Sequence, residues 1–190
     1  MSVRISPFSA LCLAAAALVC ACERVDDRAP PGQVSEYEQG YALAHWQADK
    51  LRNIDKLLIV KGGRDEVEQV TREIARIAAR TAERLEAHAA AGSIVLDVEY
   101  LPEIEAAARN RMGFGIAGEL LLSFGCDFED KLLFTEAVAV MRMLAIAEEM
   151  AAEAPDAVQE RLWSEIVAEV EPVFEQIREL LNTCGEAEKP

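Results

Sequence analysis

The chain has 190 residues, 34 acidic against 19 basic side chains, and a formal net charge of −15. This length suits one compact domain with its own core, and the alanine-, glutamate- and leucine-rich composition favours helices. The negative charge argues against nucleic acid as a partner. Most of the acidity lies late in the chain, because residues 93–190 carry 21 acids and 7 bases. Such a surface serves either solubility or the binding of a basic partner.

Residues 1–21 have the pattern of a secretory signal peptide. A short basic start containing Arg4 precedes the apolar run at 11–19, which is too short to span a bilayer. The sequence Val-Cys-Ala-Cys at 19–22 resembles the lipobox of bacterial lipoproteins. This resemblance implies that Cys22 is lipidated and becomes the first residue after cleavage. The alternative is an ordinary signal peptide that is cut near position 21.

The resemblance also implies a location. Glu23, rather than an aspartate, follows Cys22, and in lipoproteins this slightly favours the outer membrane. We therefore expect a periplasm-facing protein that is held to the membrane by its N-terminal lipid. Residues 22–33 are polar, with two prolines and a glycine, and predict a flexible tether. A single helical domain at 34–185 and a charged tail at 186–190 complete the predicted organisation.

Apolar residues at helical spacing, bounded by capping residues and glycines, predict five helices in the domain. They lie at about 35–61, 65–91, 101–124, 127–153 and 157–184. Ser35 with Glu38, and Asp156 with Gln159, have the spacing of helix N-caps. Because the connections are short, neighbouring helices should run antiparallel. The sequence therefore predicts an all-α fold, an up-and-down antiparallel bundle of about five helices.

Residues 132–147 form the most apolar stretch of the domain. Leu133 and Val140 recur at seven-residue spacing on one helical face, and Val138 and Met141 extend the apolar surface around the helix. A helix that is apolar on so much of its surface must be buried among others. We expect this helix, with Asp127 as its N-cap, to be the centre of the bundle.

Two cysteines, Cys126 and Cys184, remain after removal of the signal peptide and lipidation of Cys22. Export to an oxidising compartment favours their pairing. A hairpin that turns at Pro155 would place both at its open end, because each lies 29 residues from that proline. We expect a disulfide that closes the C-terminal helical hairpin. Two buried free thiols are the alternative.

A basic ridge on the second helix consists of Arg72, Arg76, Arg80 and Arg84, which recur at every fourth residue. Two explanations remain open for this ridge. Its arginines pair with glutamates inside the molecule, or they meet anionic lipid headgroups or an acidic partner.

Glycines at 113, 115 and 118 match the spacing of a dinucleotide-binding loop. No strand precedes them and no βαβ unit surrounds them, so close helix packing or a small cavity is the better interpretation. The candidate cavity lies between the third and fourth helices, at Phe114, Gly115, Gly118 and Met141. His45 and His88 are offset too far along their helices to share a ligand, and no catalytic grouping is apparent. We therefore predict no metal, cofactor or catalytic residue.

These features together favour a non-enzymatic, lipid-anchored interaction protein of the cell envelope. In architecture it resembles pilotins, which escort secretion pores, or immunity proteins, which neutralise a toxin, but no motif matches either family. Its expected partners are the membrane, through the lipid, and a protein of unknown identity. The alternative is a helical bundle that binds a small molecule or lipid in the cavity described above.

Overall fold

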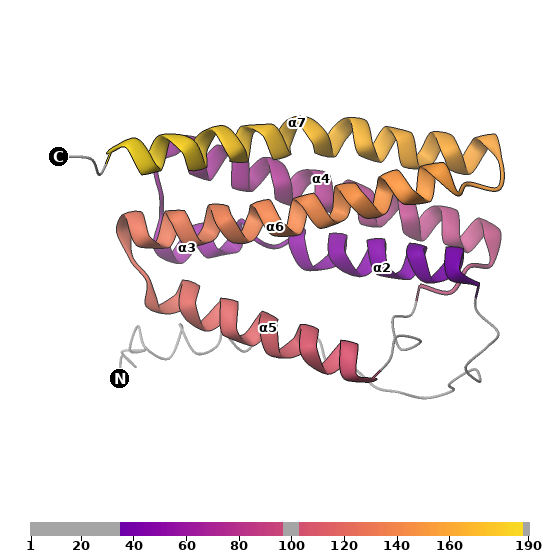
Figure 1. The fold of residues 1–190 in the computed structure, drawn as a ribbon, viewed down its shortest axis with the longest axis horizontal. Helices are drawn as coiled ribbons and strands as arrows, with labels where there is room; N and C mark the ends of the chain where they lie inside the picture. Colours follow the sequence, from indigo (N-terminus) through magenta and orange to yellow (C-terminus); the bar gives the residue numbers. More distant parts are fainter. Residues whose placement is uncertain (1–34, 97–102, 188–190) are drawn as a thin grey trace, which may run out of the picture. The chain divides into compact units, whose positions relative to one another are not determined.

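Six helices make up most of the chain that the computed structural model describes, residues 35–96 and 103–187 (Figure 1). They are α2 (Glu36–Leu51), α3 (Lys56–Lys61), α4 (Asp65–Gly92), α5 (Glu103–Leu122), α6 (Gly125–Ala152) and α7 (Ala157–Ala187). These residues contain no strand, so the all-α prediction is confirmed. The predicted signal peptide, the lipidated Cys22, the tether and residues 188–190 of the tail lie outside the described residues.

Side-chain caps fix the starts of α2 and α7. Ser35 Oγ accepts the Glu38 amide at 3.2 Å, and the Ser35 amide donates to the Glu38 carboxylate at 2.8 Å, so the predicted capping box is present. Asp156 Oδ1 accepts the amides of Val158 and Gln159, both at 2.9 Å. These bonds lower the pKa of Asp156, because they favour its charged form. Both caps satisfy amides that have no partner inside the helix.

The first predicted helix is divided in two. Residues 52–55 form a turn between α2 and α3, in which amides bond to carbonyls three residues back, as Ile54 does to Leu51. Asn53, Ile54 and Asp55 all have modest helix propensity, so this segment holds a regular helix poorly. The prediction of one continuous helix over 35–61 was therefore wrong.

Two other helix ends differ by one to three residues from their predicted positions. Ser93, rather than Gly92, takes the left-handed conformation after α4, with φ of 57°. α6 begins at Gly125 behind an extended Phe124, so Asp127 is not its N-cap. Asp127 lies instead in the first turn, where a carboxylate stabilises the positive end of the helix dipole.

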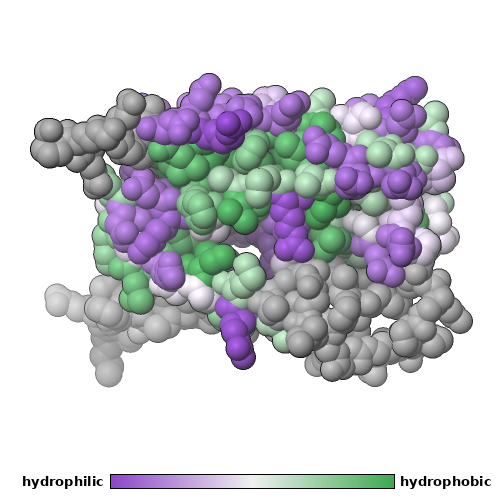
Figure 2. All heavy atoms as spheres, viewed as in Figure 1, coloured by the Kyte–Doolittle hydropathy of each residue, from purple (hydrophilic) through white to green (hydrophobic). Residues whose placement is uncertain are grey.

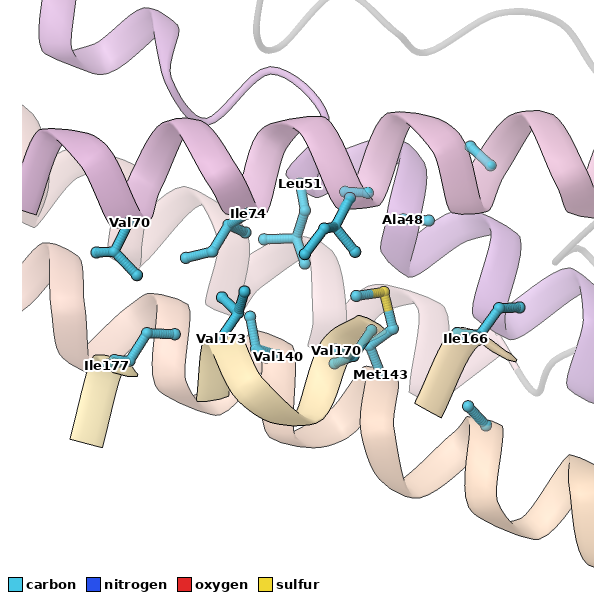
Figure 3. Packing of buried hydrophobic residues seen from close by; sticks show 14 of the residues in the cluster. Ala48, Leu51, Val70, Ile74, Val140, Met143, Ile166, Val170, Val173 and Ile177 are labelled. Atoms are coloured by element: carbon cyan, nitrogen blue, oxygen red, sulfur yellow. The ribbon is translucent and has the colours of Figure 1, made fainter. Parts of the chain in front are cut away.

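Four helices pack around a shared core. α2 and α7 each contact both α4 and α6, and α6 and α7 lie side by side along much of their length (Figure 1). Figure 3 shows Val70 and Ile74 of α4 pointing toward Val140 of α6 and Val173 of α7. Burial of such large aliphatic side chains stabilises the fold by about 1.5–3 kcal/mol each. The core is thus supplied by helices from both halves of the sequence.

α5 takes a smaller part in this packing than the other long helices. It makes its main contact with α6, and Leu120 is the one buried hydrophobic residue among its described side chains. Lys61 Nζ fixes its C-terminal end by donating to the carbonyls of Leu121 at 2.7 Å and Ser123 at 3.0 Å. The same ammonium lies 3.6 Å from the ring centroid of Phe124. α5 is therefore anchored where it joins α6.

Candidate functional site

The basic ridge is balanced by carboxylates of the same chain. Within α4, Arg72 pairs with Glu68 at 2.5 Å and Arg76 pairs with Glu73. The hydrogen bond from Arg76 lowers the pKa of Glu73, because it stabilises the carboxylate. These exposed pairs contribute little to stability on their own.

The other two arginines of the ridge cross to a second helix. Arg80 and Arg84 both reach the carboxylate of Glu169 on α7, at 2.9 and 2.5 Å. Between the two helices lies an open groove of about 830 Å³, with Ile77 and Val173 among its lining residues. Because the groove carries carboxylates beside its arginines, it lacks the excess positive charge of an anion site.

The four residues of the candidate cavity lie on the surfaces of α5 and α6. Phe114 is 57% exposed and Met141 is 50% exposed. A Cβ atom added at Gly115 or Gly118 would meet nothing within 4 Å. In the described structure these residues therefore offer open surface rather than an enclosed space.

α6 has an apolar face toward solvent, which the sequence pattern did not reveal. We call Phe134, Val138, Met141 and Ala145 the outer stripe. All four are exposed, Phe134 to 65%, and their spacing places them on one side of the helix. Figure 2 shows hydrophobic side chains among charged ones at the surface over α6. The prediction that Val138 and Met141 extend the buried surface was wrong, because α5 does not cover them.

The opposite face of α6 buries a carboxyl group without a partner. Glu136 is fully buried, and neither of its oxygens makes a hydrogen bond with a residue that the structure describes. Burial raises its pKa to about 8. The Thr71 hydroxyl of α4 lowers that pKa, but its contact with Glu136 falls short of hydrogen-bond geometry. Glu136 therefore holds its proton at neutral pH and is a polar defect in the core.

A second buried glutamate, Glu129, lies seven residues earlier on the same face of α6. It is bonded twice by one residue: the Arg64 amide donates to Oε1 at 2.8 Å and Arg64 Nε donates to Oε2 at 2.5 Å. Arg64 is the N-cap of α4, so this carboxylate also lies near the positive end of that helix. Glu129 thus ties α6 to the start of α4.

Aromatic rings join α2 and α7 at the end of the core away from Glu129. Trp163 is fully buried, and its ring centroid lies 4.8 Å from that of Tyr41. Trp163 Nε1 donates to the Tyr37 hydroxyl at 3.1 Å. Burial raises the pKa of Tyr41, whose ring also stacks on His88 at 5.7 Å. His88 is thus part of the packing between helices.

Of the two cysteines predicted to pair, the structure describes the side chain of one. Cys126 is an exposed free thiol in this structure, and the side chain of Cys184 lies outside the described residues. No group of three or more metal-ligating side chains occurs among the residues described. Within the same residues, no helix is both long and apolar enough to cross a membrane.

Comparison with known proteins does not place the chain in a family. No protein-family model, no curated protein and no solved structure matches it.

Proposed function

We propose that this chain is a lipid-anchored, non-catalytic protein of the cell envelope that binds another protein through the outer stripe of α6. The observation that carries the proposal is the exposure of Phe134, Val138 and Met141 at helical spacing. Contiguous large apolar side chains at a surface mark sites of interaction. The binding of a partner would remove them from water.

The N-terminal segment supports the anchored location. Lipidation of Cys22 would attach the protein to the periplasmic face of a membrane, with the outer membrane slightly favoured by Glu23. A polar tether at 22–33 would let the domain reach a partner at some distance from the bilayer. An anchor of this kind suits an adaptor, whether it acts like a pilotin or like an immunity protein.

Crosslinking in intact cells tests this function. A photoreactive residue in place of Val138 is expected to form a crosslink to another protein, whereas one in place of Val158, which is 68% exposed on α7, is not. Cys22→Ser is expected to release the chain from the membrane fraction and to weaken the Val138 crosslink. The proposal fails if positions 138 and 158 give the same crosslinks.

We propose in addition that α2, α4, α6 and α7 form an up-and-down bundle whose C-terminal hairpin is closed by a disulfide between Cys126 and Cys184. In the sequence, the first turn of α6 and the last turns of α7 contain these two residues. Helices of 28 and 31 residues that run antiparallel from one loop would bring these ends together.

The disulfide has a direct test. Chain isolated from the envelope without reductant is expected to have no free thiol, and reduction is expected to lower the free energy of unfolding by about 4 kcal/mol on the chain-entropy model. Cys126→Ser should show the same loss and no further effect of reductant. Thiol labelling of both cysteines before reduction would rule out the pairing.

A further inference from the structure

We propose that the outer stripe is the docking site for a basic amphipathic helix of a partner protein. This inference rests on the proposed function, since it names the class of partner that the anchored protein would bind. It is carried by three properties of the stripe: its shape, the acids at its two ends, and the charge of the rest of the chain.

The shape of the stripe suits a helix. From Phe134 to Ala145 it spans about 16 Å along α6, or three helical turns. It is one side chain wide, and its residues alternate in steps of four and three. An amphipathic helix that lies along α6 would match this row with its own residues at i, i+3, i+4 and i+7. A small-molecule site is usually a concave pocket enclosed by several elements, whereas the stripe lies on one face of one helix.

The ends of the stripe are acidic. Asp130 precedes Phe134 on the same line of α6, and Glu148 follows Ala145 on it. Both are exposed, and no ion pair between described residues includes either of them; Lys131, beside Asp130, pairs with Asp127. Their separation of about 27 Å corresponds to 18 residues of helix. The partner helix is therefore expected to carry lysine or arginine near both ends and apolar side chains between them.

Charge also favours a basic helix over two other possible occupants of the stripe, a second copy of this chain and an anionic lipid surface. In a symmetric pair of copies, the acidic ends of the two stripes would meet each other, and each chain carries a net charge of −15. Like charges brought together at an interface oppose association. Anionic lipid headgroups would be repelled by Asp130 and Glu148 in the same way. A basic helix is attracted at both ends.

The test uses the full-length chain in detergent and two synthetic helices of about 20 residues. Both peptides have leucines in the middle turns, and their end turns carry either lysines or glutamates. We expect the lysine peptide to bind, with affinity that falls as salt rises, and the glutamate peptide not to bind. Fluorescence anisotropy of labelled peptide measures both.

Matched variants locate the binding. Combining Phe134→Ser with Met141→Ser is expected to weaken binding of the lysine peptide by about tenfold or more. Val158→Ser removes an exposed apolar side chain on α7 and should leave the affinity unchanged. Combining Asp130→Asn with Glu148→Gln should reduce the salt dependence. Circular dichroism confirms that each variant is folded, as expected for exposed positions.

Several results would overturn the inference. One is equal binding of the two peptides, and another is unchanged binding of the lysine peptide to the stripe variant. A dimer seen by sedimentation that disappears in the stripe variant would assign the stripe to a second copy. If the peptide fails but the Val138 crosslink forms in cells, the proposed function stands with a partner of other chemistry. If both fail, both proposals fall.

Discussion

Replacement of Glu136 by leucine is expected to raise the free energy of unfolding by about 3 kcal/mol at pH 7. Burial raises the pKa of Glu136 to about 8, whereas the ordinary value is 4.5. At pH 7 ionisation of this group stabilises the unfolded chain but not the folded chain, in which no described residue compensates the charge. Leucine has a similar size and no polar atoms, so it removes this penalty.

The pH dependence follows from the same shift. Below pH 4.5 the group is protonated in both states, and its penalty is absent. Between pH 4.5 and about 8 the folded state keeps a proton that the unfolded state has lost, so stability falls as pH rises. Above about pH 8 the penalty is constant. Urea denaturation across this pH range should therefore show that the free energy of unfolding of Glu136→Leu exceeds that of wild type by an amount that grows with pH.

Two controls separate the ionisation of Glu136 from its polarity and from burial in general. Glu136→Gln keeps a polar group in the core but cannot ionise. Its free energy of unfolding should therefore differ from that of Glu136→Leu by an amount that does not change with pH. Glu129→Gln should lower stability, by about 1–3 kcal/mol, because it weakens the charge-assisted bonds from Arg64. A Glu136→Leu variant that is less stable than wild type at pH 7 would show that the carboxyl group has a partner in the folded protein.

Trp163→Ala is expected to lower the free energy of unfolding by about 4 kcal/mol. The indole is fully buried, contacts the Tyr41 ring, and donates its N–H to Tyr37, so its removal leaves a large cavity between α7 and α2. Urea denaturation followed by circular dichroism measures the change.

A milder variant tests the hydrogen bond within this cluster. Tyr37→Phe keeps the ring but removes the acceptor of the Trp163 N–H, and should cost about 1 kcal/mol. If Trp163→Ala lowers the free energy of unfolding no more than Tyr37→Phe does, then the Trp163 side chain does not pack α7 on α2.

Local features of the fold were predictable from short sequence patterns. The caps at Ser35 and Asp156 depend on side chains that reach amides two or three residues away, so spacing alone identifies them. The break at 52–55 was harder, since no glycine or proline marks it. Modest propensities of three adjacent residues produced it, and these are weak signals one at a time.

The candidate site depended on contacts that sequence spacing does not contain. Arg80 and Arg84 pair with Glu169, which lies 85 residues after Arg84 in the sequence. This pairing becomes apparent only from the packing of α4 on α7. The sequence did not reveal the outer stripe, because apolar residues at helical spacing look the same in a sequence whether another helix covers that face or solvent does. α6 is apolar on two faces: one packs against α2, α4 and α7, and the other, which carries the outer stripe, meets water.

The order of helix contacts bears on how the chain folds. α2 packs on α4, to which it is joined by residues 52–64 with the short helix α3, and α6 packs on α7, to which it is joined by residues 153–156. Closing either pair costs less chain entropy than bringing the two pairs together, because the segment that joins the helices within a pair is shorter than the segment between the pairs. Distant parts of the sequence meet when the α2–α4 pair packs on the α6–α7 pair, through contacts of α2 with α6 and of α4 with α7. The folding rate should therefore be limited by the packing of one pair on the other, and mutations at the interface between the two pairs should slow folding more than mutations within either pair.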